Sequence, residues 1–169
     1  MKTLIVYFSH NKENYFGGTI RSVEVGNTQI VAEKLQSMLD ADIYQIKPLH
    51  EYPEKYDECT AIARKELDNN ERPKIMNMVP YMEEYDTIYL GYPNWWGTMP
   101  MCLWTFLESY DLKDKKIYPF CTHEGSGLGN SINDLKKICS QSIIKKGLAL
   151  KGSQVNQSDQ KLKEWLKEE

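Results

Sequence analysis

The sequence contains no hydrophobic run approaching the roughly 18 residues that cross a membrane, and its N-terminus lacks the features of a secretory signal. It has no C-x-x-C pair, and its four scattered cysteines fit a reducing compartment better than a disulfide framework. The three histidines show no metal-ligand spacing with one another or with the cysteines. We therefore expect a cytoplasmic protein with no membrane segment and no metal.

A strong excess of either charge is also missing. The chain has 21 Lys and Arg residues against 24 Asp and Glu residues, a net charge of −3, which argues against nucleic acid as a partner. No Pro-, Gly- or Ser-rich linker interrupts residues 1–169, and 41% of the residues are hydrophobic. We expect a single domain over residues 1–169, as a monomer or a homodimer.

Apolar runs and helical patterns alternate along the chain. The predicted strands are 3–8, 42–47, 86–92, 115–121 and 147–152, and the predicted helices are 27–39, 53–69, 100–110, 130–139 and 159–167. The first, third and fourth runs lack clean polar alternation, which is typical of strands covered on both faces. The pattern predicts an α/β fold with a five-stranded parallel sheet and helices on both faces.

In such a fold, ligands bind in the loops beyond the carboxyl ends of the strands. The first loop is unusually long, because residues 10–25 separate strand from helix where connections usually take about 2–6 residues. It supplies neutral donors near a helix N-terminus, where an anion is favoured. It lacks the lysine of a Walker motif. The alternative is that Asn27 and Thr28 only cap the helix.

The second and third loops indicate a flat ligand. Trp95 and Trp96 are adjacent in YPNWWG, so one could stack on an aromatic ring while the other covers an end of the core. In the third loop, glycines surround Ser126 and allow close approach of the backbone. Ser126 is not a nucleophile elbow, because Glu124 replaces the first glycine of G-x-S-x-G. Together the three loops suit a phosphorylated planar heterocycle.

These segments in order, VYFSHNKENYFGG, VEVGNTQIVAEKL, YPNWWGTMPMCLWTFLE and PFCTHEGSGLGNS, resemble the flavodoxin family, and in particular a bacterial flavodoxin-like branch. The resemblance covers nearly the whole chain. It implies a doubly wound sandwich with strand order 2-1-3-4-5 and FMN as cofactor. The insertion at residues 10–25 would belong to the phosphate-binding turn, with residues 14–18 as a flap beside the FMN.

The resemblance also implies a set of cofactor-binding residues. Those expected at the phosphate are Ser9, Gly26, Asn27 and Thr28, with Asn11 and Tyr15 as additional contacts. Those expected along the isoalloxazine are Pro93, Asn94, Trp95, Trp96 and Gly97, with Thr122, His123, Glu124, Gly125, Ser126 and Gly127 at its other edge. A charged His123 would favour the anionic reduced flavin and Glu124 would oppose it, unless both side chains point to solvent.

The sequence thus predicts an FMN-binding redox protein that carries electrons through the flavin. It leaves open whether the protein passes electrons to a protein partner or is an NAD(P)H-dependent reductase of quinones or similar acceptors. The alternative is a flavin-binding or interaction protein without turnover. The sequence argues against a phospho-receiver domain, since the first and third strands end in Phe8-Ser9 and Tyr92-Pro93 rather than in an acidic cluster.

Overall fold

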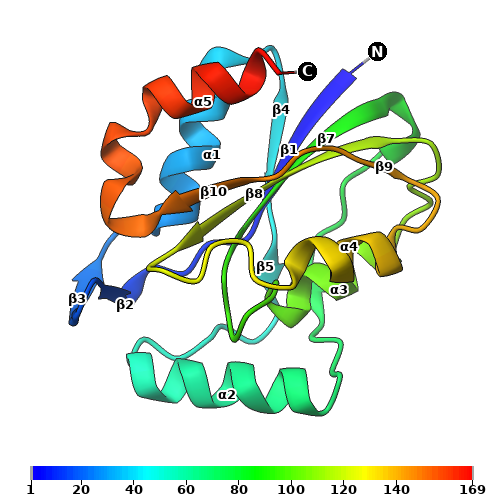
Figure 1. Ribbon diagram of the computed structural model, residues 1–169. Coiled ribbons are helices and arrows are strands. Elements are labelled where there is room, and N and C mark those ends of the chain that lie inside the picture. The colour runs from blue at the N-terminus through cyan, green and yellow to red at the C-terminus, as the bar shows by residue number, and fades with distance from the viewer. Residues whose placement is uncertain (1, 169) are drawn as a thin grey trace.

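The computed structural model describes residues 2–168, which build a central parallel sheet with helices on both faces (Figure 1). Its main strands are, in spatial order, β4 (Asp42–Gln45), β1 (Lys2–Tyr7), β7 (Tyr85–Pro93), β8 (Lys116–His123) and β10 (Leu148–Lys151). Numbered along the chain, these five strands have the order 2-1-3-4-5. The predicted flavodoxin-like fold class is confirmed.

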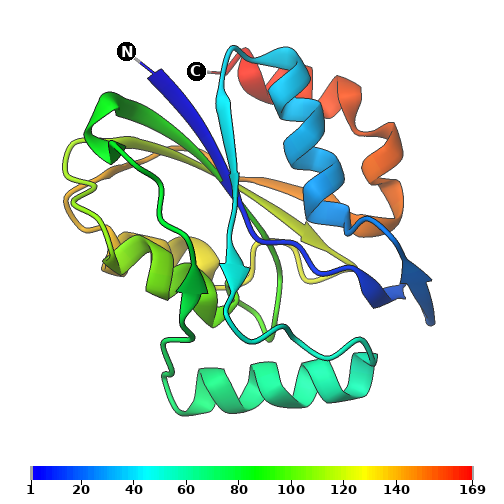
Figure 2. The same cartoon turned by 180° about the vertical axis from the view of Figure 1, so that it is seen from behind.

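All five predicted helices are present. They are α1 (Asn27–Met38), α2 (Tyr56–Asp68), α3 (Met101–Glu108), α4 (Ser131–Ile138) and α5 (Asp159–Leu166), with 3-10 turns η1 (Met82–Glu84) and η2 (Gly152–Gln157). Helices α1 and α5 cover one face of the sheet and α3 and α4 the other, whereas α2 lies beyond one end of the sheet (Figures 1 and 2). Helix α2 begins at Tyr56, three residues later than expected from Pro53.

The core has two halves, one on each face of the sheet. Alternate residues of β1 divide between them: Leu4 packs in the cluster that contains Phe106 of α3, and Ile5 packs in the cluster that contains Leu35 of α1. All four side chains are almost completely buried. Full burial of one such side chain is worth about 1.5–3 kcal/mol, so this alternation fixes which face of β1 meets which helices.

The fifth strand is split, which the sequence reading did not anticipate. Besides β10, a short strand β9 (Ile143–Ile144) pairs with the start of β8. The carbonyl of Ile117 accepts a hydrogen bond from the Lys145 N–H, so Ile117 and, two residues on, Pro119 face this edge of the sheet. Pro119 has no N–H to offer the neighbouring strand, which accounts for the break between β9 and β10.

The long first loop is a β-hairpin rather than an irregular flap. Strands β2 (Lys12–Phe16) and β3 (Thr19–Val23) pair antiparallel with each other and stand apart from the central sheet (Figure 1). Gly17 and Gly18 form the turn with φ of 52° and 114°, values that a side chain would strain. A second small pair, β5 (Lys47–Pro48) with β6 (Ile75–Met76), also lies outside the main sheet.

Two further features concern the described residues as a whole. No helix within residues 2–168 has the length and apolar character needed to cross a membrane. The same residues contain no group of three or more His, Cys, Asp or Glu side chains arranged to hold a metal ion.

Candidate functional site

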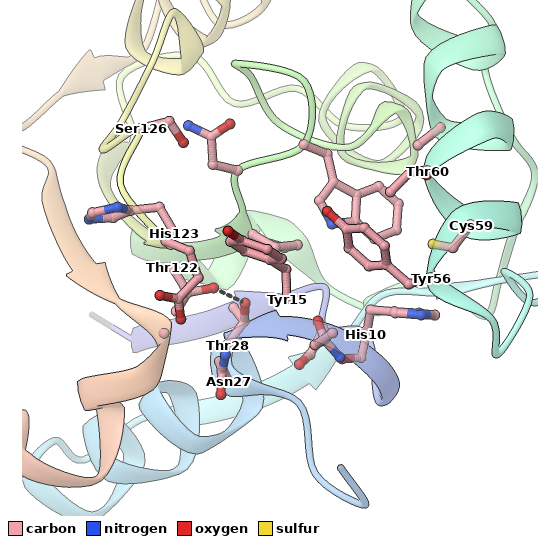
Figure 3. A pocket seen from close by; sticks show the side chains of 18 of the residues that line it. His10, Tyr15, Asn27, Thr28, Tyr56, Cys59, Thr60, Thr122, His123 and Ser126 are labelled. Carbon is pink, nitrogen blue, oxygen red and sulfur yellow. Dashed lines mark hydrogen bonds between the residues drawn. The ribbon is translucent and has the colours of Figure 1, made fainter. Parts of the chain in front are cut away.

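A cavity of about 620 Å³ opens at the carboxyl ends of β1, β7 and β8 (Figure 3). This volume lies within the range of about 300–1,000 Å³ that is typical of cofactor and small-molecule sites. The predicted site residues that line it are Ser9, Tyr15, Asn27, Thr28, Pro93, Asn94, Trp95, Trp96, Thr122, His123, Glu124, Gly125 and Ser126. The three loops chosen from the sequence therefore meet around one cavity.

Four predicted site residues do not line the cavity. Asn11 donates a hydrogen bond to the Glu24 carbonyl at the base of the hairpin (3.4 Å). Gly26 packs against the end of β1, while Gly97 and Gly127 lie behind the cavity wall as partners of Asn94. The three glycines thus contact Ser9 and Asn94, which do line the cavity.

One end of the cavity is the N-terminus of α1. The Ser9 hydroxyl accepts a hydrogen bond from the Gln29 N–H (3.1 Å), so the end of β1 caps this helix. The Thr28 and Thr122 hydroxyls are 2.8 Å apart and join α1 to β8. Neither Asn27 nor Thr28 caps α1 with its side chain, so the simpler alternative drawn from the sequence is wrong.

Gly26 allows this close packing. A Cβ at Gly26 would lie 2.3 Å from Ser9 Oγ and 2.5 Å from the carbonyl oxygen of His10. The unpaired N–H groups and the dipole of the α1 N-terminus favour an anion beside Ser9. None of the residues that line the cavity is a lysine or an arginine. An anion at this end would therefore be held by neutral donors.

Asn94 holds two of the loops together. Its backbone N–H donates a hydrogen bond to the Thr122 carbonyl (2.8 Å). Its side-chain Nδ2 donates one to the Gly127 carbonyl, also at 2.8 Å. Its Oδ1 accepts from the Gly97 N–H (3.0 Å). These bonds fix the loop after β7 against the loop after β8, so the wall between them is set before any ligand enters.

The two tryptophans point different ways, as expected. Trp95 makes edge-to-face contacts with Phe8 and Tyr52, with ring centroids 5.2 and 4.8 Å apart, and so closes an end of the core while lining the cavity. Trp96 is 51% exposed, and its Nε1 donates to the Thr60 carbonyl of α2 (2.9 Å). The expectation that one tryptophan covers the core therefore holds for Trp95.

His123 and Glu124 have protein partners. His123 Nδ1 accepts a hydrogen bond from the Gly125 N–H (2.9 Å), so a neutral imidazole carries its proton on Nε2. Burial lowers the pKa of His123, against the opposing effect of the Glu124 carboxylate. Glu124 Oε1 accepts from the Ser153 N–H (2.7 Å) at the start of η2. Both side chains therefore have backbone partners, although these contacts are solvent-exposed.

The sequence reading missed one whole wall of the cavity. Four residues of α2 face it: Tyr56, Cys59, Thr60 and Ala63. Their spacing of i, i+3, i+4 and i+7 places them on one face of the helix, but this spacing alone does not say that the face meets the cavity. Burial raises the pKa of Cys59 to about 12, so its thiol stays protonated and is not a nucleophile at neutral pH.

The other missed lining residues are His10, Glu13, Asn14 and Gly152. His10 Nε2 is buried and has no hydrogen-bond partner among residues 2–168. Burial also lowers the pKa of His10, which favours the neutral imidazole.

The model of the flavodoxin family matches residues 19–169. The chain belongs to the flavodoxin family. A candidate flavoprotein from Bacteroides uniformis is 27% identical with a TM-score of 0.75, over 96% of this chain and 97% of its own. A second, from Bacteroides eggerthii, is 29% identical with a TM-score of 0.73, over 92% and 94%.

A flavoprotein from Lactobacillus acidophilus in complex with FMN has the same fold, with a TM-score of 0.68 at 22% identity over 92% of this chain and 97% of its own. No curated protein matches the chain significantly.

Proposed function

We propose that this member of the flavodoxin family binds FMN non-covalently and carries electrons through it. The observation that supports this most directly is one cavity with two unlike ends: a helix N-terminus with hydroxyls and no cation, and an aromatic wall at Trp95. FMN presents a phosphate and a flat heterocycle, which match these two ends. Bound FMN would supply the electron chemistry, and the protein would supply binding and orientation.

The residues at the phosphate end fit this group. Ser9 and the first turn of α1 would surround the phosphate, and the Thr28–Thr122 pair fixes the position of α1 against β8. Asn27 is held nearby, since a Cβ at Gly152 would lie 2.5 Å from Asn27 Nδ2. Backbone and hydroxyl donors can bind a phosphate at a helix N-terminus without a lysine or arginine.

The residues at the other end fit a heterocycle. Trp95 would contact the ring system, and the backbone from Thr122 to Ser126 would face its polar edge. The neutral His123 imidazole offers an N–H at Nε2, because its Nδ1 already accepts from Gly125. That N–H would donate to an acceptor of the heterocycle.

The finer proposal is an NAD(P)H-dependent reductase of quinones or similar acceptors. Two observations favour it over a shuttle between proteins. The net charge of −3 gives little basis for the strong electrostatic steering of a protein partner. The cavity also has aromatic side chains that keep exposed surface, Tyr15 at 43% and Trp96 at 51%, where a second flat molecule could stack. A flavin-binding protein without turnover is the alternative.

The deciding experiment compares FMN with riboflavin, which lacks the phosphate. Purified protein freed of flavin is titrated with each, and binding is followed by quenching of flavin fluorescence. We expect FMN to bind at least tenfold more tightly; failure to take up FMN, or equal affinity for riboflavin, would contradict the proposal. Oxidation of NADH or NADPH with a quinone then separates the reductase from the protein without turnover.

A further inference from the structure

Two tyrosines line the cavity from elements that do not belong to the central sheet. Tyr15 projects from strand β2 of the hairpin, and Tyr56 is the first residue of α2. Their ring centroids are 6.3 Å apart and the ring planes are tilted by 31°. Figure 3 shows Tyr15 in the middle of the cavity, with Tyr56 on the side of α2. The residues proposed above to hold FMN lie on the strand-end loops and α1, whereas Tyr15, which the resemblance placed near the phosphate, lies against Tyr56 of α2.

Glu13 ties these two elements together. Its Oε2 accepts a hydrogen bond from the Tyr56 N–H (2.8 Å), and its Oε1 pairs with Lys55 Nζ (3.2 Å). Its own N–H donates to the Glu54 carbonyl (3.2 Å). Helix α2 has no side-chain cap of its own, so Glu13 of the hairpin serves as the cap. The spacing of the two tyrosine rings is therefore set by a contact two residues from Tyr15.

The chemistry of this pair points to a particular kind of ligand. Tyr15 is 43% exposed and Tyr56 is half-buried, so both rings keep free surface beside the cavity. Each phenol oxygen carries an O–H that can donate to a ligand. Two such rings offer stacking surface together with two O–H donors. A flat aromatic molecule that carries carbonyl oxygens uses both.

We propose that Tyr15 and Tyr56 bind a second flat, carbonyl-bearing aromatic molecule of the quinone class beside the FMN, and that Glu13 is the positioning residue that holds the two rings. This inference rests on the proposed function, because it concerns a cavity whose other part holds FMN. It assigns the hairpin a task of its own: the hairpin supplies one wall of the acceptor site.

The test measures binding, without turnover. The FMN-loaded, oxidised protein is titrated with 2-methyl-1,4-naphthoquinone by calorimetry, and the Kd for FMN is measured separately. We expect Tyr15→Leu and Tyr56→Leu to weaken quinone binding about three- to tenfold, the range that aromatic stacking supports. Tyr56→Leu, at a residue not assigned to FMN, should change the Kd for FMN less than twofold. Tyr81→Leu, at a tyrosine that is 69% exposed and outside the cavity, is the matched control and should change neither.

A test of the role of Glu13 needs a control variant that keeps its hydrogen bond with the Tyr56 N–H. Glu13→Ala should weaken the quinone about as much as loss of one ring, whereas Glu13→Gln, whose side-chain oxygen still accepts from Tyr56, should restore most of the affinity. Tm is recorded for each variant, since a merely structural role would lower Tm and leave the quinone affinity of the folded protein unchanged.

The possible outcomes are distinct. Unchanged quinone affinity in both tyrosine variants, with FMN bound normally, overturns the inference and leaves the proposed function intact. Loss of FMN from Tyr56→Leu also overturns it and places that ring in the FMN site. A wild-type protein that takes up no FMN overturns both.

Discussion

Thr28 and Thr122 are 94 residues apart in the sequence, yet their Oγ1 atoms are 2.8 Å apart and almost completely buried. The pair joins the first turn of α1 to the carboxyl end of β8. Because each hydroxyl has the other as its partner, the helix N-terminus is fixed against the third loop without any ligand. The anion end of the cavity is thus preorganised.

Replacement of Thr28 by valine tests this. Thr28→Val keeps the shape but leaves the Thr122 hydroxyl without its partner, so we expect the free energy of unfolding to fall by about 1–3 kcal/mol. FMN should lose more affinity than riboflavin, because the defect lies at the phosphate end. Urea unfolding and the two flavin titrations measure these effects. Thr28→Ser keeps the hydroxyl and should behave nearly as wild type; equal losses in both variants would show that the hydroxyl pair is unimportant.

Gly26→Ala should distort the same turn. The new Cβ would meet Ser9 Oγ at 2.3 Å and the His10 carbonyl oxygen at 2.5 Å, and backbone cannot easily move aside. Forced overpacking usually costs about 1–3 kcal/mol, so we expect lower stability and weaker FMN binding. The control is Gly147→Ala, whose Cβ would meet only side-chain atoms of Ile132 and Leu128 at 3.1–3.4 Å. If both variants retain wild-type stability and FMN affinity, the close approach at Gly26 is not needed.

The sheet and the helices could be predicted from the sequence because burial on both faces leaves a strong pattern. Runs such as residues 3–8 and 86–92 have hydrophobic residues without polar alternation, and their order restricts the topology. The hairpin left a weaker pattern, because Phe16 is the one buried side chain of its two strands. Its signal was the Gly17-Gly18 pair, a dipeptide that favours a two-residue hairpin turn.

The wall formed by α2 could not be predicted, although the helix itself was. The helix buries only Cys59 and Ala63, so its sequence does not reveal which side of the sheet it faces. Its position depends on contacts from distant residues, such as Glu13 to the Tyr56 N–H and Trp96 to the Thr60 carbonyl. Contacts of this kind follow from the folded topology and leave no periodic pattern in the chain.

The stability should depend on the protonation of His10. Burial lowers its pKa in the folded protein from the ordinary value of 6.5, so below that pH the unfolded chain binds a proton that the folded protein resists. The contribution of neutral His10 to the free energy of unfolding is complete above pH 6.5. It is lost as the pH falls toward the lowered pKa. The free energy of unfolding is measured with urea at pH 7.5 and at pH 5.5. Its decrease between the two pH values should be smaller in His10→Gln than in wild type. His50→Gln, at an exposed histidine, should retain the wild-type loss; a wild-type loss in His10→Gln as well would contradict the assignment.

His123 should influence the flavin. Its neutral imidazole at neutral pH offers an N–H, and its lowered pKa means that the charged form appears only on acidification. We expect His123→Ala to lower the reduction potential of bound FMN and to reduce its dependence on pH below 6.5, measured by anaerobic redox titration. If the potential and its pH dependence stay unchanged, His123 does not tune the flavin.

Removal of residues 12–24 tests whether the hairpin is needed for the fold or only for the cavity wall. The hairpin strands pair only with each other, and Asn11 already contacts the Glu24 carbonyl, so two glycines can join Asn11 to Val25. We expect cooperative urea unfolding to persist, because no strand of the central sheet loses a partner. The cavity would lose the wall that contains Tyr15, so FMN should dissociate faster and the quinone affinity should fall. The deletion variant is compared with Glu13→Ala, which breaks the contact between the hairpin and α2 but keeps the hairpin. Unchanged FMN release, quinone binding and turnover in the deletion variant would show that the hairpin has no part in the site.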